Sequence, residues 1–314
     1  MSNTFKGYFF AIVSAVSYGT NPLGVLFLYE EGLRPVSVLF YRFTVAALIL
    51  ASLMIVQRKS FALTRKEAKV LLLLGTLFVA SSFTFYQSFR FMAAGLASTI
   101  LFFYPVMVAV IMAVFFGEKV RAGTVVSIAL ALAGILLLYQ SDGSTSMSMT
   151  GMVLVIVSAL TYALYIVMVN MSEIRMSSVK LTFYVLLICI FSNIVASFFD
   201  PAGGLQPIPN LRACIWVLWL GIFPTVISLV TMTMAVQYVG STPTAIMGAL
   251  EPLTAVAIGA AVFNEQLTPR LALGIMMILS AVMIIVMSKQ LSPMRVLSFV
   301  NAIGHKVIKY WRWR

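Results

Sequence analysis

The sequence has few of the side chains from which catalytic and metal centres are built. Its 314 residues contain one histidine, His305, and two cysteines, Cys189 and Cys214, which we expect to be buried, unreactive thiols. A metal cluster or a histidine-based catalytic centre needs several such groups close together, so neither can be assembled. A glycine-rich, lysine-containing loop for ATP is also missing. We therefore expect no enzyme activity, no metal and no cofactor.

Charged residues are scarce as well. They make up 10% of the chain, against about 25% in soluble domains, while 61% of the residues are hydrophobic. Continuous apolar runs of about 20 residues, long enough to cross a ~30 Å hydrocarbon layer, recur along nearly the whole length. Lipid leaves backbone groups no external partner, and the runs do not alternate as barrel strands do. The sequence therefore predicts an all-α membrane protein.

The apolar runs predict ten transmembrane helices. The first run is too long for a signal peptide and has no small-residue cleavage site, so it counts as a span. Ten spans put both termini on the same side of the membrane. The expected spans are 7–29, 36–56, 70–90, 95–116, 122–139, 151–171, 180–199, 212–236, 243–263 and 270–288.

Basic residues gather on one side of this predicted topology. The side with the termini receives Lys6, the loop residues between 58 and 69, Lys119 and Arg121, Arg175 and Lys180, and the basic C-terminal residues. The opposite side receives Arg34, Arg90, Arg212 and Arg270 alone. Because lysine and arginine favour the cytoplasmic side, we expect an inner-membrane protein with both termini in the cytoplasm. The net charge of +12 then reflects topology and contact with anionic lipid, and not nucleic-acid binding.

Two halves of the chain resemble each other. Residues 12–18 read IVSAVSY and residues 156–162 read IVSALTY, an offset of 144. Pro105 precedes Glu118 by 13 residues, and Pro252 precedes Glu265 by the same 13. A Ser-, Thr- and Gly-rich segment from residue 140 to 150 separates the halves. We therefore expect a first repeat over 1–140, a second over 150–289, and a tail over 290–314.

Each half has five spans, and an odd number turns the second half upside down relative to the first. Two inverted five-helix repeats are an architecture of secondary transporters, in which the two bundles exchange conformations around a midplane site. Duplication in a membrane protein without transport activity is the alternative. The repeat is the main functional signal in the sequence.

Several segments resemble the EamA-type branch of the drug/metabolite transporter superfamily. The similar segments are AVSYGTNP in the first span, FYRF around Arg42, YPVMVAVIMAVFFGEKV after residue 103, SALTYALYIVMVN in the sixth span, and ALEPLTAVAIGAAVFNEQLTP in the ninth. The chain departs from the family pattern at Tyr18, where tryptophan is usual, and in its tail. The resemblance implies a ten-helix carrier with a central cavity that moves amino acids or other small amphipathic metabolites outward.

Arg42 and Glu251 are the ionisable residues deepest in the expected spans. At about 1.5 Å per residue, Arg42 lies ~9 Å and Glu251 ~18 Å below the outer edge. A charge at such depth costs about 2.5–3.5 kcal/mol, so each should face a cavity or a partner. Either Glu251 binds a substrate amine or a proton, or the two residues form a static ion pair, or Arg42 extends its head group outward.

Prolines interrupt three spans. Pro105 and Pro252 occupy matching positions of the two halves, and Pro22 follows Asn21 in the first span. Proline removes a backbone hydrogen bond and kinks a helix, which is tolerated where the freed carbonyls line a cavity. The breaks therefore indicate a midplane site, although a kink that only improves packing would give the same pattern.

Polar and aromatic side chains recur near these breaks. Tyr18 and Asn21 share a helical face, as do their repeat equivalents Tyr162 and Tyr165. We expect these residues, with Tyr86, Gln87 and Tyr104, to line an amphipathic substrate pocket. Packing or anchoring at the membrane interface is the alternative for each tyrosine.

The ends of the two repeats carry further polar features. Glu118 and Glu265 close the fourth and ninth spans and are expected to cap loop backbone groups, with a gate as the alternative. From Ser292 onward, an apolar stripe with clustered lysine and arginine predicts an amphipathic helix on anionic lipid; a partner-binding or disordered tail is the alternative.

Taken from the residues and the resemblance, the expected function is export of small amphipathic metabolites, amino acids first, either facilitative or proton-coupled. A nucleotide-sugar or phosphate-ester antiporter is the alternative within transport, but it would need more cavity cations than Arg42. A membrane scaffold is the alternative outside transport. The expected partners are the substrate and the bilayer, and the sequence leaves open whether the chain forms a homo-oligomer.

Overall fold

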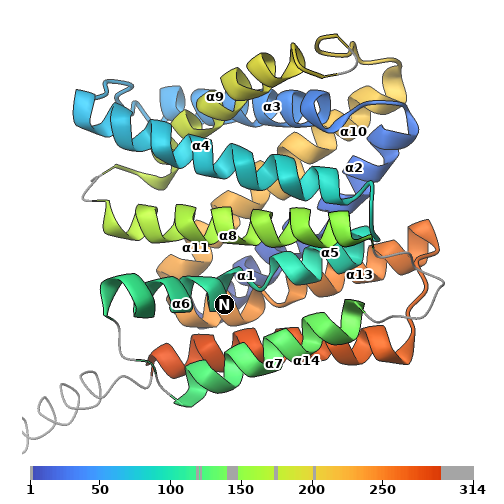
Figure 1. Cartoon of the computed structure of the whole chain (residues 1–314). Helices are drawn as coiled ribbons and strands as arrows, with labels where there is room; N and C mark the ends of the chain where they lie inside the picture. Colours follow the sequence, from blue (N-terminus) through green and yellow to red (C-terminus); the bar gives the residue numbers. More distant parts are fainter. Residues whose placement is uncertain are drawn as a thin grey trace, which may run out of the picture.

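The computed structural model describes residues 3–117, 120, 122–139, 148–172, 176–200 and 203–290. Within these ranges every regular element is a helix, which confirms the predicted all-α class. The helices lie side by side along roughly one direction and form a single bundle (Figure 1).

Ten apolar helical segments match the ten predicted spans. In the described part of the chain, nine are long and apolar enough to cross a membrane, and Ala122–Leu138 is a shorter tenth. Six segments are unbroken: α3 (Pro35–Val56), α4 (Arg65–Ser88), α7 (Ala122–Tyr139), α8 (Met149–Met171), α9 (Ser178–Ser197) and α14 (Pro269–Gln290). Four are interrupted: α1 (Asn3–Gly19) with α2 (Asn21–Glu30), α5 (Ala94–Leu101) with α6 (Tyr104–Phe116), α10 (Leu211–Gly221) with η1 (Ile222–Ile227) and α11 (Ser228–Val239), and α12 (Ser241–Met247) with α13 (Leu250–Phe263).

Helix boundaries differ from the expected ones by a few residues, for local chemical reasons. The third segment begins at Arg65 and not at residue 70, because the Thr64 hydroxyl accepts the Glu67 amide and the Glu67 carboxylate accepts the Thr64 amide. This reciprocal cap satisfies two amides that the first turn leaves free. Other boundaries shift the opposite way, since α4 ends at Ser88 and α9 at Ser197, each two residues before its expected end.

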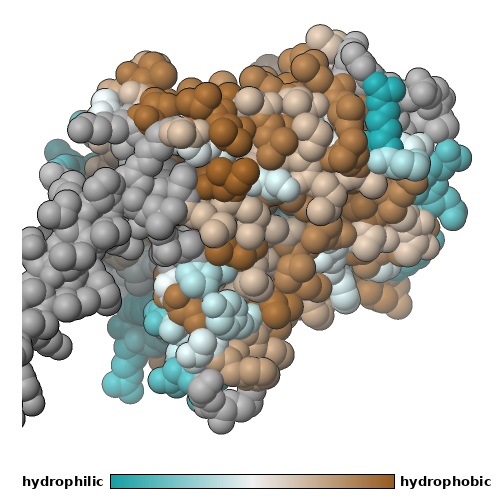
Figure 2. Space-filling view, turned by 90° about the horizontal axis from the view of Figure 1, so that it is seen from below, coloured by the Kyte–Doolittle hydropathy of each residue, from teal (hydrophilic) through white to brown (hydrophobic). Residues whose placement is uncertain are grey.

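The outer surface of the bundle is apolar, as a lipid-facing surface must be. Large side chains there include Phe115, Phe191 and Leu136, which are 76%, 67% and 61% exposed. On the face drawn in Figure 2, hydrophobic residues cover the middle and hydrophilic ones gather toward the two ends. In water such a surface would drive aggregation, so its natural surrounding is lipid.

Matching helices of the two predicted halves make matching contacts. Helix α1 packs on α11, and α8, at the same position of the second half, packs on α4. A buried serine pair joins each contact: Ser14 donates to the Ser228 carbonyl at 2.8 Å, and Ser158 donates to the Ser81 carbonyl at 2.8 Å. Ser14 and Ser158 are the serines of the repeated IVSA segment. These contacts agree with a repeat, while the inverted insertion of its halves stays a prediction.

Some predictions fall on residues that the structure does not describe. They concern Glu118, most of the segment between the halves, and the amphipathic helix after Ser292.

Cys189 is buried and Cys214 is partly buried, and neither forms a disulfide.

Candidate functional site

The three predicted helix breaks occur, and each lies just before its proline. Pro22 and Pro105 lie in the first turn of α2 and α6, and Pro252 is the third residue of α13. The first turn of a helix has free amides, so a proline there removes no hydrogen bond. The chain therefore stops and restarts its helix at these points, and the prolines do not kink a continuous helix.

A fourth interruption was missed by the sequence analysis. The eighth segment passes through the π-helical turn η1, which contains Pro224. In this turn the Thr225 hydroxyl donates to the Leu220 carbonyl, five residues earlier, at 2.8 Å. Pro224, inside an otherwise apolar run, was the available signal. Such π turns widen a helix and often lie at functional sites.

Arg42 lies at the centre of a polar cluster built from four segments. Its Nε donates to the Thr225 hydroxyl of η1 at 2.9 Å. Its Nη1 donates to Asn21 Oδ1 of α2 at 3.1 Å and to the Tyr86 hydroxyl of α4. Tyr86 also donates to Asn21 Oδ1, at 2.9 Å. Arg42 is only 5% exposed, so its head group is held inside the bundle and does not reach its surface.

The cluster leaves hydrogen-bonding capacity unused. Guanidinium has five N–H donors; the bonds to Thr225, Asn21 and Tyr86 come from Nε and Nη1 of Arg42, and Tyr18 is a further side-chain partner. Within the cluster, Asn21 Nδ2 is buried and has no partner in the described part of the chain; Gln87 Oε1, outside the cluster, is likewise unpartnered. Buried polar atoms are nearly always satisfied in a native protein, so unpartnered ones indicate a place for water or a ligand.

Glu251 lies in the first turn of α13, close to the end of α1. The two helices touch because Gly19 has no side chain: a Cβ there would lie 2.6 Å from the Glu251 carbonyl oxygen. Glu251 is only partly buried, and it forms no ion pair with Arg42, although the structure describes both side chains. Tyr18 lies close enough to interact with both Arg42 and Glu251. Arg42 and Glu251 therefore do not pair with each other, and Tyr18 lies within electrostatic range of both.

The remaining tyrosines form an aromatic wall. Tyr104 and Tyr162 meet edge to face with ring centroids 4.7 Å apart, and Tyr162 stacks on Tyr165 at 5.9 Å. Phe78 of α4 lies against Tyr165 at 5.4 Å. Tyr104 is near enough to Glu251 and Tyr18 to interact with both. All the predicted site residues except Gln87 therefore lie in one of these connected groups; their role in substrate binding stays a prediction.

Glu265 acts as a cap and lies outside this group. Its carboxylate accepts the backbone amides of Ala94 at 2.8 Å and Gly95 at 3.3 Å, the first residues of α5. A carboxylate at a helix amino end satisfies free amides and the helix dipole. The predicted capping of backbone groups is therefore the arrangement found at Glu265.

Comparison with known proteins extends these observations. The EamA-like transporter family model matches residues 5–140 and again residues 149–287. An uncharacterized transporter of Archaeoglobus fulgidus is 29% identical over 189 residues, which cover 60% of this chain and 66% of that protein. An uncharacterized transporter of Clostridium kluyveri is 22% identical over 286 residues, covering 87% of this chain and 91% of the other.

A solved crystal structure shares the fold. It has a TM-score of 0.66 at 16% sequence identity, and the match covers 91% of this chain and 98% of that one. At this identity the likeness concerns the fold alone. The two family matches together cover most of the sequence, so this chain belongs to the EamA-like transporter family.

Proposed function

We propose that the chain is a secondary carrier that exports small amphipathic metabolites, amino acids first, across the inner membrane by alternating access. The observation behind the proposal is that Arg42 and Glu251 lie inside apolar segments without pairing with each other. A static ion pair would have offset the cost of placing both charges at that depth. Two separate, unlike charges instead suit a substrate that brings the complementary two.

An amino acid has the required chemistry. Its carboxylate accepts from Arg42 Nη2, and its ammonium group donates to Glu251, with the Tyr18 hydroxyl available to either end. Charge-assisted hydrogen bonds of this kind are the strong ones in proteins. The wall of Tyr104, Tyr162 and Tyr165 offers an apolar face with polar tips to the substrate side chain. This combination favours zwitterions with an apolar or aromatic side chain.

Alternating access draws its support from the repeat. The family model matches the chain twice, and the two serine pairs join matching helices of the two halves. Two similar halves in inverted orientation, related by a pseudo-two-fold axis in the membrane plane, can exchange conformations and so expose a midplane site to one side and then the other. The placement of both termini in the cytoplasm rests on the basic residues of the loops.

The alternative functions fit the site less well. A phosphate ester carries two negative charges and would meet Glu251 beside the single cation Arg42. A scaffold without transport activity would have no use for either charge at this depth, and it predicts that joint replacement of both by apolar residues is tolerated.

Flux measurements in proteoliposomes test the proposal. The purified chain is reconstituted and offered labelled amino acids, nucleosides and a sugar phosphate, with and without an imposed pH gradient. We expect amino-acid flux that Glu251→Gln lowers at least tenfold while expression and folding are unchanged. Glu67→Gln, an exposed residue in the cap of α4, is the matched control and should keep its flux.

Each outcome has a distinct meaning. Acceleration by the pH gradient, lost in Glu251→Gln, identifies proton coupling at Glu251, whereas flux that ignores the gradient identifies a facilitative carrier. Normal flux in Glu251→Gln contradicts the proposed role of Glu251. Absence of flux for every substrate under both conditions favours the scaffold.

A further inference from the structure

A basic cavity lies at one end of the bundle, apart from the Arg42 cluster. It has a volume of about 250 Å³ and is lined by Tyr29, Gly32, Leu33, Arg34, Pro35 and Arg90. These residues come from the end of α2, the turn into α3, and the segment that follows α4. A single water needs about 10–15 Å³ of volume measured in this way, so the space has room for a small organic molecule.

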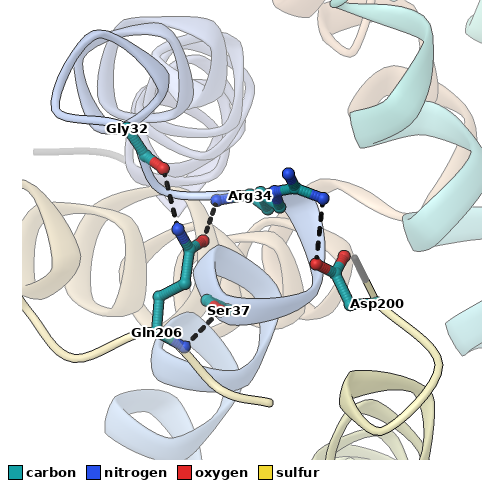
Figure 3. Close-up of polar contacts among 5 residues, drawn as sticks. All are labelled: Gly32, Arg34, Ser37, Asp200 and Gln206. Carbon is teal, nitrogen blue, oxygen red and sulfur yellow. Dashed lines mark hydrogen bonds and ion pairs between the residues drawn. The ribbon is translucent and has the colours of Figure 1, made fainter. Parts of the chain in front are cut away.

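The lining carries an excess of positive charge. It contains two arginines and no carboxylate. Arg34 Nη1 pairs with Asp200 at 3.2 Å, so that charge is compensated (Figure 3). Arg90 is exposed and forms no ion pair within the described part of the chain. The start of α3 at Pro35 adds the partial positive charge of a helix amino end.

Hydrogen bonds fix the wall around Arg34 before any ligand arrives. Gln206 Oε1 accepts the Arg34 amide at 2.7 Å, and Gln206 Nε2 donates to the Gly32 carbonyl at 3.0 Å. The Gln206 amide in turn donates to the Ser37 hydroxyl at 3.0 Å (Figure 3). The turn therefore keeps its shape, and a ligand binding there meets a preorganised wall, which lowers the entropic cost of binding.

Tyr29 connects this cavity to the central cluster. Its hydroxyl donates to the Tyr86 carbonyl at 2.8 Å, and the Tyr86 hydroxyl is one of the partners of Arg42. Tyr29 also lies within electrostatic range of Arg90. One aromatic side chain therefore lines the cavity and contacts α4, one of the four segments that build the central cluster.

We propose that this cavity binds one oxyanion group, a carboxylate or a phosphate ester, with Arg90 as its main charged ligand and Tyr29 and Leu33 packing against the rest of the molecule. The inference concerns a site separate from Arg42 and does not depend on which substrate the central site takes. A free organic acid and the head group of an anionic lipid offer the same chemistry.

Arginine-selective modification by phenylglyoxal, located by mass spectrometry, tests the assignment in the purified full-length chain. The probe is benzoate in neutral detergent, and benzamide is its uncharged match. We expect benzoate to slow modification of Arg90 and not of Arg212, which pairs with Glu31 outside the cavity. Benzamide should protect neither. Because the contact is ionic, protection should weaken as salt is raised.

Binding of labelled benzoate to variants supplies a second measurement. Arg90→Gln should weaken binding about tenfold, the loss of one charge-assisted hydrogen bond. Arg212→Gln should change it less than twofold. The protection assay uses the wild-type chain, so it remains decisive if a variant fails to fold.

Nanodiscs distinguish the two sources of the oxyanion. Protection of Arg90 by phosphatidylglycerol, absent in phosphatidylcholine, identifies a lipid head group; protection by benzoate in both lipids identifies a free acid. If neither benzoate nor phosphatidylglycerol protects Arg90, or if benzamide protects it equally well, or if Arg212 is protected to the same extent, the proposal is overturned.

Discussion

Replacing Gly19 by alanine tests how tightly the end of α1 is joined to the start of α13. The added Cβ would lie 2.5 Å from Thr254 Cβ and 2.6 Å from the Glu251 carbonyl oxygen. Carbon atoms in good contact are about 3.5–4.0 Å apart, so the helices must separate by roughly 1 Å. Overpacking of this kind costs about 1–3 kcal/mol. The higher helix propensity of alanine offsets about 0.8–1 kcal/mol of that cost.

The net loss of folding stability should therefore be small, about 0–2 kcal/mol, while the loss of transport should be large. One of the clashing atoms belongs to Glu251 itself, so relief of the clash moves that residue away from Tyr18. A displacement of about 1 Å is enough to disrupt a preorganised site. We expect at least a tenfold loss of flux in Gly19→Ala.

Gly24 supplies a matched control in the next helix. It is also buried, but a Cβ there meets only side-chain atoms of Leu220, at 2.7 and 2.8 Å. A leucine side chain can change rotamer, whereas a backbone carbonyl cannot. Gly24→Ala should therefore cost about 1–3 kcal/mol of stability, as overpacking does, but keep its flux within about twofold of wild type, because no atom of Glu251 is displaced.

Two measurements decide the outcome: detergent-induced unfolding followed by tryptophan fluorescence, and flux of the substrate found in the proteoliposome panel. A Gly19→Ala variant that is more stable than wild type and transports normally would refute the close contact. Equal loss of flux in Gly19→Ala and Gly24→Ala would show a general sensitivity to added volume and remove the special role of the Glu251 contact.

Two further substitutions test the polar contacts at the helix ends. Glu265→Ala should lower the free energy of unfolding by about 1.5–3 kcal/mol in the same assay, because the Ala94 amide loses a charged acceptor. Glu265→Gln should recover part of this loss. If both variants were as stable as wild type, the capping role of Glu265 would be contradicted. Gln206→Leu should cost about 1–3 kcal/mol and speed hydrogen exchange at the Arg34 amide at least tenfold, because the turn at Gly32 loses its bridge. An unchanged hydrogen-exchange rate at the Arg34 amide would show that the turn keeps its shape without the Gln206 side chain.

The number and place of the helices could be predicted from the sequence because membrane-spanning segments follow from composition alone. An apolar run of about 20 residues has one stable form in lipid, whatever its neighbours are. The family match also confirms that the chain is a transporter and not an enzyme. The prolines indicated three helix breaks for a similar reason. Proline lacks the amide that a helix interior needs, so it favours the first turn of a new helix whatever the rest of the fold is.

The partners of the buried charges could not be predicted in this way. The depth of Arg42 along its helix follows from counting residues, but the direction of its side chain depends on which helices surround α3. Those neighbours come from α2, α4 and η1, between 21 and 183 residues away in the sequence. The π turn that brings Thr225 to Arg42 has no counterpart in the repeat pattern, and Pro224 was its one visible sign.

The η1 turn also bears on how two similar halves would hold the zwitterionic substrate proposed above. The two halves match in their serine pairs and in the tyrosines Tyr18 and Tyr162, yet Arg42 belongs to the first half and Glu251 to the second. A site made only of repeated residues would present the same chemistry at both ends of a substrate. Arg42 in one half, Glu251 in the other, and the extra turn at Thr225 make the two ends of the proposed site chemically different. The proposed site would therefore bind a zwitterion in one orientation, whereas a site of repeated residues alone would not distinguish its two ends.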